Sequence, residues 1–142
     1  MHNKNYVLKV IVLFSLIILT PYSVQAQTQA VDDQNRIARD LIRVLEAYAV
    51  YKMGQYDLAF ERYTALAEDG NRQGMLNVAN MYLEGKGVKQ SDTNAFKLYL
   101  KLAESGDRMG MEQTATAYRL GRGVQKDLGQ AQYWEAQTKT QN

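Results

Sequence analysis

The sequence has no cysteine, one histidine and one proline among its 142 residues. The histidine is His2 and the proline is Pro21, so the chain beyond residue 26 has no imidazole, thiol or proline. This excludes Ser-His-Asp and Cys-His catalysis there, and a zinc site of Cys and His ligands. An enzyme would have to use carboxylates, Lys or Tyr, and the acidic residues are scattered among polar neighbours. We therefore expect no catalytic residues, no metal site and no cofactor.

A long hydrophobic run is also missing. Residues 10–19 are apolar apart from one serine, whereas a transmembrane helix needs about 20 apolar residues. Lys4 and Lys9 precede this run, Pro21 follows it and is expected to break any helix, and small residues lead up to Ala26. The pattern predicts a secretory signal peptide over residues 1–26, cleaved near Ala26, and hence a periplasmic or secreted protein. The alternative is an uncleaved segment that serves as a membrane anchor.

The chain also has little excess of charge. It carries 17 basic and 15 acidic residues, and two of the basic ones, Lys4 and Lys9, lie in the predicted signal, which leaves 15 of each sign. Binding to nucleic acid depends on a basic surface, so we do not expect nucleic acid as a partner. We expect contact with a membrane only through the signal segment. Without cysteine, an exported domain must be held together by packing alone.

What the sequence does contain is an internal repeat of 36 residues. Residues 59–88 match residues 95–124 at 15 of 30 positions. Ala59, Tyr63, Leu66 and Ala67 fall at i, i+4, i+7 and i+8, which is one face of a helix, and the later copy repeats this spacing. The offset recurs a third time at Ala131.

Glycines are expected to end the helices in each copy of the repeat. Gly70 and Gly106 are expected to stop one helix, and the spacing predicts further helices at about 72–83 and 108–120. The loops Gly85-Lys86-Gly87-Val88 and Gly121-Arg122-Gly123-Val124 then reverse the chain, and we expect both valines to tuck under the turn as small core residues. Ser91 and Asp127 are favoured N-cap residues for the helices that follow.

The segment before the repeat is a longer helix pattern over residues 34–53. Its apolar stripe is expected to pack, and it consists of Ile37, Leu41, Val44, Leu45, Tyr48 and Tyr51. The sequence thus predicts an all-α protein, an α/α solenoid of about three antiparallel hairpins over 34–69, 72–105 and 108–139. We expect a flexible leader over 27–33, a repeat domain over 34–139 and a disordered tail over 140–142.

These features resemble the Sel1-like repeat. They are the Gly-x-Gly-Val loop, the capping Ser or Asp, the Ala that follows with an aromatic residue three or four positions on, and the helix that ends in Tyr. That family is a relative of the tetratricopeptide repeat with a longer loop, and the resemblance covers about residues 59–136. Trp134 meets the consensus Trp, where the preceding copy has Leu98. Asn77 meets the consensus Asn, which Gln113 replaces in the next copy, and Thr114 stands at a consensus Leu. Trp134 is expected to seal the C-terminal end of the core; a ligand-stacking role is the alternative.

The resemblance implies a binding protein rather than an enzyme. Stacked hairpins curve so that their first helices line a concave face, which can hold a peptide or a helix. The groove residues of the tetratricopeptide pattern correspond here to Tyr48, Tyr51, Asn77, Asn80, Gln113 and Thr116. In the alternative interpretation Asn77 only bonds backbone between repeats and the two tyrosines only pack.

Three functional interpretations follow. The first is an exported scaffold or adaptor that binds a protein or peptide of the cell envelope, or a secreted protein. The second is an inhibitor or immunity-type protein that blocks a secreted enzyme. The third is a carboxylate-based hydrolase of an envelope polymer. The sequence does not identify the partner.

Overall fold

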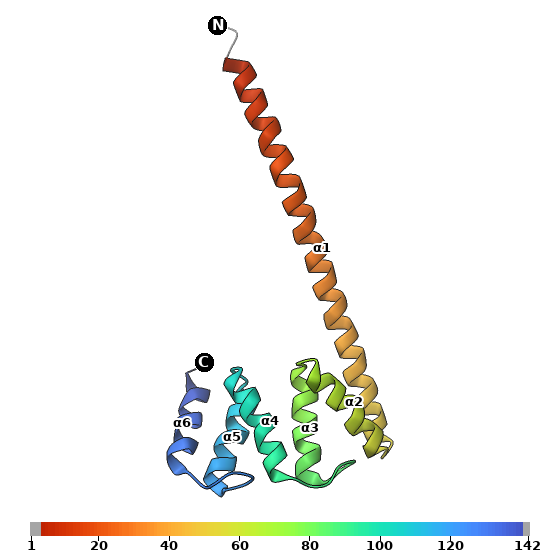
Figure 1. The fold of residues 1–142 in the computed structure, drawn as a ribbon, viewed down its shortest axis with the longest axis vertical. Coiled ribbons are helices and arrows are strands. Elements are labelled where there is room, and N and C mark those ends of the chain that lie inside the picture. The colour runs from red at the N-terminus through yellow and green to blue at the C-terminus, as the bar shows by residue number, and fades with distance from the viewer. Residues whose placement is uncertain (1–3, 141–142) are drawn as a thin grey trace. The chain divides into compact units, whose positions relative to one another are not determined.

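The computed structural model describes the backbone of residues 4–140 and the side chains of residues 24–140. In this part of the chain all regular structure is helical and no strand occurs, in agreement with the predicted all-α class (Figure 1). The six helices are α1 (Lys4–Lys52), α2 (Tyr56–Glu68), α3 (Arg72–Glu84), α4 (Asp92–Glu104), α5 (Arg108–Leu120) and α6 (Leu128–Lys139). The chain divides into two compact units, Met1–Arg39 and Asp40–Asn142.

The first unit consists of the N-terminal part of α1, and it differs from the sequence prediction. Pro21 does not break the helix, and residues 27–33, expected as a flexible leader, are helical. The chain has no glycine before Gly54, and a single proline removes one helical hydrogen bond without forcing the helix to end. Cleavage near Ala26 stays a prediction. Within the residues that the structure describes, no helix has the length and apolar character needed to cross a bilayer.

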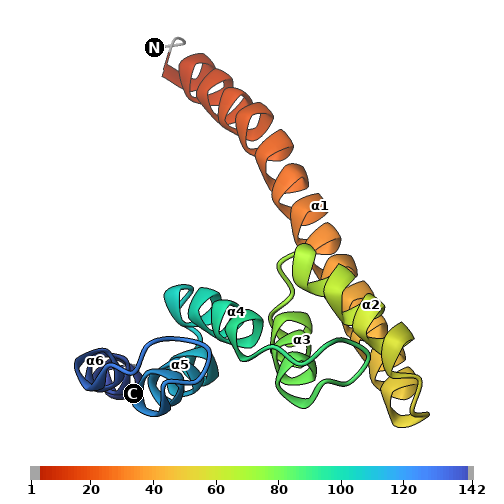
Figure 2. The same cartoon turned by 60° about the horizontal axis from the view of Figure 1, so that its bottom comes forward.

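The second unit is a stack of helix hairpins that begins at Asp40, rather than at residue 34 as predicted. From α2 to α6 each helix packs against the next one along the chain, and the two views show them side by side in chain order (Figures 1 and 2). The predicted hairpins are present as α1 with α2, α3 with α4, and α5 with α6. The end of the predicted tail, residues 141–142, lies outside the described residues.

The helix ends follow from local side chains. Ser91 accepts a hydrogen bond from the Asn94 backbone N–H at 3.2 Å, and Asp127 accepts one from Gln130 at 2.9 Å. Both predicted N-caps are therefore confirmed, since each satisfies a donor that the first helical turn leaves free. At the other end, α3 stops at Gly85, whose φ of +66° is the left-handed conformation that ends a helix.

The Gly-x-Gly-Val loops depend on a close backbone approach. A Cβ atom on Gly87 would overlap the carbonyl oxygen of Tyr56, at the start of α2. Gly123 lies in the same way against the backbone of Asp92, at the start of α4. Each loop thus rests on the helix of the preceding hairpin, which explains the second glycine of the motif. Val88 is half-buried in this loop rather than part of the core.

The core is built from alanine, larger aliphatic residues, methionine and tyrosine of α1 to α4. It comprises Ala47, Val50, Ala59, Tyr63, Leu66, Ala67, Met75, Leu76, Val78, Ala79, Met81, Ala95, Tyr99 and Leu102. The apolar stripe predicted to pack on α1 is wrong for four of its six members, because Ile37, Leu41, Leu45 and Tyr48 are each more than half exposed. The first helix of a stack has a partner on one side only, so the face with Ala47 and Val50 is buried instead.

Two polar groups in the later hairpins are enclosed without a hydrogen bond to any described residue. The side chain of Thr114 is fully buried in α5, and its hydroxyl has no partner. The indole Nε1 of Trp134 is likewise buried and unpaired, while its ring packs edge-on against Tyr133 at 5.1 Å between centroids. Trp134 is half-buried, so it covers the C-terminal end of the stack only in part.

Candidate functional site

A pocket of about 130 Å³ opens between α1 and α3, with one wall from α2. Four of the six predicted groove residues line it, namely Tyr48, Tyr51, Asn77 and Asn80. The other lining residues are Tyr63, Met81 and Glu84. Tyr48 is 52% exposed, so the pocket is open to molecules outside the protein. We call it the first pocket.

The remaining two predicted residues, Gln113 and Thr116, line a second pocket between α3 and α5, which is smaller at about 10 Å³. The two pockets are related by the 36-residue repeat. The residues Tyr63, Asn77, Asn80 and Met81 of the first pocket correspond to Tyr99, Gln113, Thr116 and Ala117 of the second. The predicted set therefore falls into two equivalent places in successive repeats.

Helical spacing explains this grouping. Asn77, Asn80, Met81 and Glu84 lie at i, i+3, i+4 and i+7 on α3, so they share one face. Tyr48 and the residue three positions later, Tyr51, do the same on α1. The first helices of successive hairpins thus present their polar faces on one side of the stack, as predicted from the repeat.

The two asparagines differ in their contacts. Asn80 is tied into the structure, because the hydroxyl of Tyr99 donates a hydrogen bond of 2.6 Å to its Oδ1. Tyr99 is only 4% exposed, and burial, with a smaller effect of Glu84, raises the pKa of Tyr99 to about 12. Asn77, for which a backbone bond between repeats was the alternative interpretation, makes no side-chain hydrogen bond among the described residues, so its amide is available to a ligand.

Tyr63 forms the inner part of the first pocket. Its side chain is 2% exposed, and its hydroxyl makes no hydrogen bond to the described residues. Burial raises the pKa of Tyr63, and the phenol groups of Tyr48 and Tyr51 add to the rise. Tyr63 is the repeat counterpart of Tyr99.

Charge at the rim of the first pocket is neutralised internally. The Nζ of Lys86 lies 2.8 Å from Glu84 Oε2 and donates a hydrogen bond of 2.8 Å to the Tyr51 hydroxyl, which itself donates to Glu84 at 3.3 Å. The ammonium group also lies over the rings of Tyr51 and Tyr56, at 5.2 and 5.3 Å from their centroids. The hydrogen bond from Lys86 lowers the pKa of the Glu84 carboxyl, and Glu84 in turn raises the pKa of Lys86.

Sequence reasoning missed this cluster. It placed Lys86 in a reversing loop and did not single out Glu84. The available signal was the basic residue between the two glycines, which recurs as Arg122, and Arg122 lines the second pocket. Tyr63 and Met81 were missed as well, because their helical spacing is that of core residues, and both are in fact nearly buried while they line the pocket.

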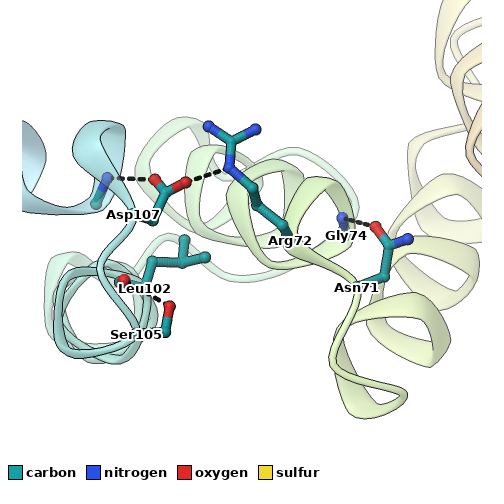
Figure 3. A network of polar contacts seen from close by, with 7 residues as sticks. Asn71, Arg72, Gly74, Leu102, Ser105 and Asp107 are labelled. Atoms are coloured by element: carbon teal, nitrogen blue, oxygen red, sulfur yellow. Dashed lines mark hydrogen bonds and ion pairs between the residues drawn. The ribbon is translucent and has the colours of Figure 1, made fainter. Parts of the chain in front are cut away.

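A second polar network, at the turns that lead into α3 and α5, is structural (Figure 3). Asp107 accepts a hydrogen bond of 2.7 Å from the Gly110 N–H and pairs with Arg72 across the gap between two hairpins. Asn71 caps α3 through the Gly74 N–H at 3.0 Å. These side chains satisfy helix ends and one another. No group of three or more metal-ligating side chains occurs in the described part of the chain.

This stack of antiparallel helix pairs defines an α/α solenoid of the helical-repeat class. A family model described as the Sel1 repeat matches residues 72–107 and 108–134. The chain therefore contains two Sel1 repeats, formed by α3 with α4 and by α5 with α6, and these bounds agree with the predicted hairpins. Comparison with curated proteins gives no match.

Two solved structures have the same fold. The Sel1 repeat protein from Oxalobacter formigenes is 30% identical in sequence with a TM-score of 0.58, and the match covers 61% of this chain and 66% of that one. A protective antigen present in uropathogenic Escherichia coli strains, which displays an SLR fold, is 35% identical with a TM-score of 0.58. That match covers 61% of this chain and 18% of the antigen, so this chain corresponds to a small part of it.

Proposed function

We propose that this protein is an exported scaffold whose groove, the face that carries the two pockets, binds a segment of another protein. The observation that carries the proposal is the grouping of the six predicted residues into two equivalent pockets in successive repeats. Such a periodic surface suits a chain that lies across the repeats and contacts each in turn. Sel1-repeat scaffolds in general suit protein interaction, which supports the same role here.

The chemistry of the groove supports binding rather than hydrolysis. Carboxylate-based glycoside hydrolysis needs two acidic groups on either side of the scissile bond. Each pocket has a single carboxylate in its lining, Glu84 in the first and Asp92 in the second, and Glu84 is already paired with Lys86. Amides, hydroxyls and aromatic rings make up most of the remaining lining, and these are contact groups for a peptide.

Photocrosslinking from inside the groove tests this proposal. A photoreactive amino acid is placed at Tyr48 or Thr116 in the groove, or at Lys97 on the exposed side of α4 as the matched control. Irradiation of living cells should give protein adducts from Tyr48 and Thr116, and few from Lys97. The same adducts from all three positions, or none from the groove, would count against a groove-bound partner.

Export is part of the proposal and has a separate test. The features that support it are Lys4 and Lys9, the short apolar run and the small residues before Ala26. We expect the protein in the periplasmic or secreted fraction, with Gln27 as its first residue by N-terminal sequencing. A cytoplasmic product that still begins at Met1 would contradict this, and a membrane-bound product with an intact N-terminus would support an anchor instead.

A further inference from the structure

The first pocket has a size and a set of free groups that suggest what enters it. We propose that it receives a single tyrosine side chain of the bound protein segment, with the phenol hydroxyl hydrogen-bonded to Asn77 and Tyr63. This inference rests on the proposed function, since it names the chemistry of the partner at that site.

Size sets the first condition. The pocket holds about 130 Å³, and a cavity of about 150 Å³ accepts one benzene molecule. The first pocket is therefore close in size to one six-membered ring. The equivalent second pocket, at about 10 Å³, has room for little more than one water molecule. The two pockets are thus unequal, and only the first can take a ring.

The walls favour an aromatic ring. Tyr48 and Tyr51 contribute aromatic side chains from α1 to the lining, and Met81 contributes a thioether side chain from α3. Aromatic pairs are stabilised beyond the area that they bury, and sulfur–aromatic contacts are favourable as well. A saccharide ring carries several hydroxyl groups, more than the few unengaged polar groups of this pocket can satisfy.

The polar groups favour a ring with one hydrogen-bonding substituent. The Asn77 amide and the Tyr63 hydroxyl make no side-chain hydrogen bonds among the described residues, and Tyr63 is 2% exposed. The amide can donate and accept, and so can the hydroxyl, which matches a phenol that does both. Phenylalanine would leave these groups without a partner and is therefore the weaker occupant.

Charge excludes a cation as the preferred occupant. The one carboxylate in the lining, Glu84, is held by Lys86 at 2.8 Å and by the Tyr51 hydroxyl. Lys86 also occupies the outer side of the Tyr51 ring. A lysine or arginine entering the pocket would find no unpaired negative charge, whereas a neutral phenol needs none.

The test compares small probes that represent alternative occupants. The complete chain, purified in the form that the cell delivers, is titrated with p-cresol, toluene and methyl β-glucoside, and binding is followed by saturation-transfer NMR. We expect p-cresol to bind about fivefold more tightly than toluene, the ratio given by one net hydrogen bond, and the glucoside not to bind. Equal binding of toluene and p-cresol, preference for the glucoside, or no binding of p-cresol would overturn the proposal.

Variants locate the site. Asn77→Leu removes the amide at similar volume, and Tyr63→Phe removes only the hydroxyl; each should abolish the preference for p-cresol over toluene. Gln113→Leu, at the equivalent position of the second pocket, is the matched control and should leave the preference unchanged. Circular dichroism checks that each variant folds, and a preference that survives both Asn77→Leu and Tyr63→Phe would overturn the assignment.

The outcomes separate this inference from the proposed function. Groove crosslinks without p-cresol binding would leave the scaffold role intact and remove the tyrosine assignment. Binding of p-cresol at the first pocket without groove crosslinks would show that the pocket accepts a phenol, but it would count against the scaffold role and against a tyrosine supplied by a bound segment. When both are found, soluble p-cresol should reduce the crosslinks formed from Tyr48 more than those from Thr116.

Discussion

At the scale of single residues, Thr114 stands out because a fully buried hydroxyl without a partner destabilises the fold. Removing a group of this kind by a substitution of the same shape recovers about 1 kcal/mol. We expect Thr114→Val to raise the melting temperature by roughly 4–8 °C, the shift that about 1 kcal/mol gives in a domain of this size. Thermal denaturation followed by circular dichroism measures it.

The control is Thr116→Val on the same helix. The Thr116 hydroxyl donates to the Glu112 carbonyl at 2.9 Å and is half-exposed, so its loss should change the melting temperature little. A Thr114→Val variant that melts below the wild type would show that the buried hydroxyl is satisfied in the folded protein.

The hydrogen bond between Tyr99 and Asn80 predicts energetic coupling between α3 and α4. Asn80→Ala and Tyr99→Phe should each cost about 1 kcal/mol of unfolding free energy. The double variant should cost less than the sum of the two, because both remove the same bond. Urea denaturation of the four proteins in the cycle measures the coupling, and strictly additive losses would argue against the bond.

The raised pKa of Tyr99 predicts loss of stability in alkali. Its pKa of about 12 in the folded state exceeds the ordinary tyrosine value of 10.0, so the folded protein holds the proton more tightly than the unfolded chain. The stabilisation is complete below pH 10 and is lost as the pH rises from about 10 to 12. Tyr99→Phe should flatten this fall in melting temperature, whereas a Tyr133→Phe control, at an exposed position, should not.

The groove residues show how far residue-scale prediction reaches. The resemblance to the tetratricopeptide pattern named Asn77 and Asn80, and helical geometry places both on one face of α3. It could not assign their bonds, because the Asn80 partner, Tyr99, comes from the next helix. The contacts of Lys86 with Glu84 and Tyr51 could not be predicted either, because they depend on how the loop folds back on α1.

At the scale of elements, the Gly-x-Gly-Val loop predicts two different costs for glycine replacement. Gly54 and Gly87 both have positive φ, at 78° and 67°, but only Gly87 lies against backbone. Gly54→Ala should cost about 1–2 kcal/mol from conformation alone. Gly87→Ala should cost roughly 1–3 kcal/mol more, because its Cβ overlaps the Tyr56 carbonyl. Urea midpoints compare the two, and equal losses would mean that the loop shifts freely.

Helix boundaries were largely predictable, because caps and glycines act locally. The bounds expected for α3 and α5 agree with the structure to within one residue. The extent of α1 was not predicted. Pro21 was expected to break the helix, but the surrounding sequence contains no glycine and the helix continues through the proline. Its buried face was also misjudged, because an apolar stripe does not reveal that a terminal helix has a neighbour on one side only.

At the scale of the whole molecule, each hairpin depends on its neighbours, and the ends of the stack are the least supported. Only Ala131 is buried in α6, whereas α3 buries six residues. We expect amide hydrogen exchange to be fastest in α6 and slowest in α3. Equal protection across the two helices would show that the stack opens as one cooperative unit.

The number of hairpins and their order followed from the 36-residue period, because a repeat that cannot bury its own apolar face has to stack. The repeat model matches two of the three hairpins, α3 with α4 and α5 with α6. The hairpin of α1 and α2 departs from the 36-residue period through its shorter connection. This hairpin also lines the first pocket.

The internal pairing of Glu84 with Lys86 has a consequence for how a partner arrives. A groove whose rim charge is already compensated exerts little long-range attraction, so encounter proceeds by unsteered diffusion at about 10⁵–10⁶ M⁻¹s⁻¹. The association rate constant should then change little between dilute buffer and high ionic strength. A surface of this kind would keep its affinity for a partner as the ionic strength of the medium changes.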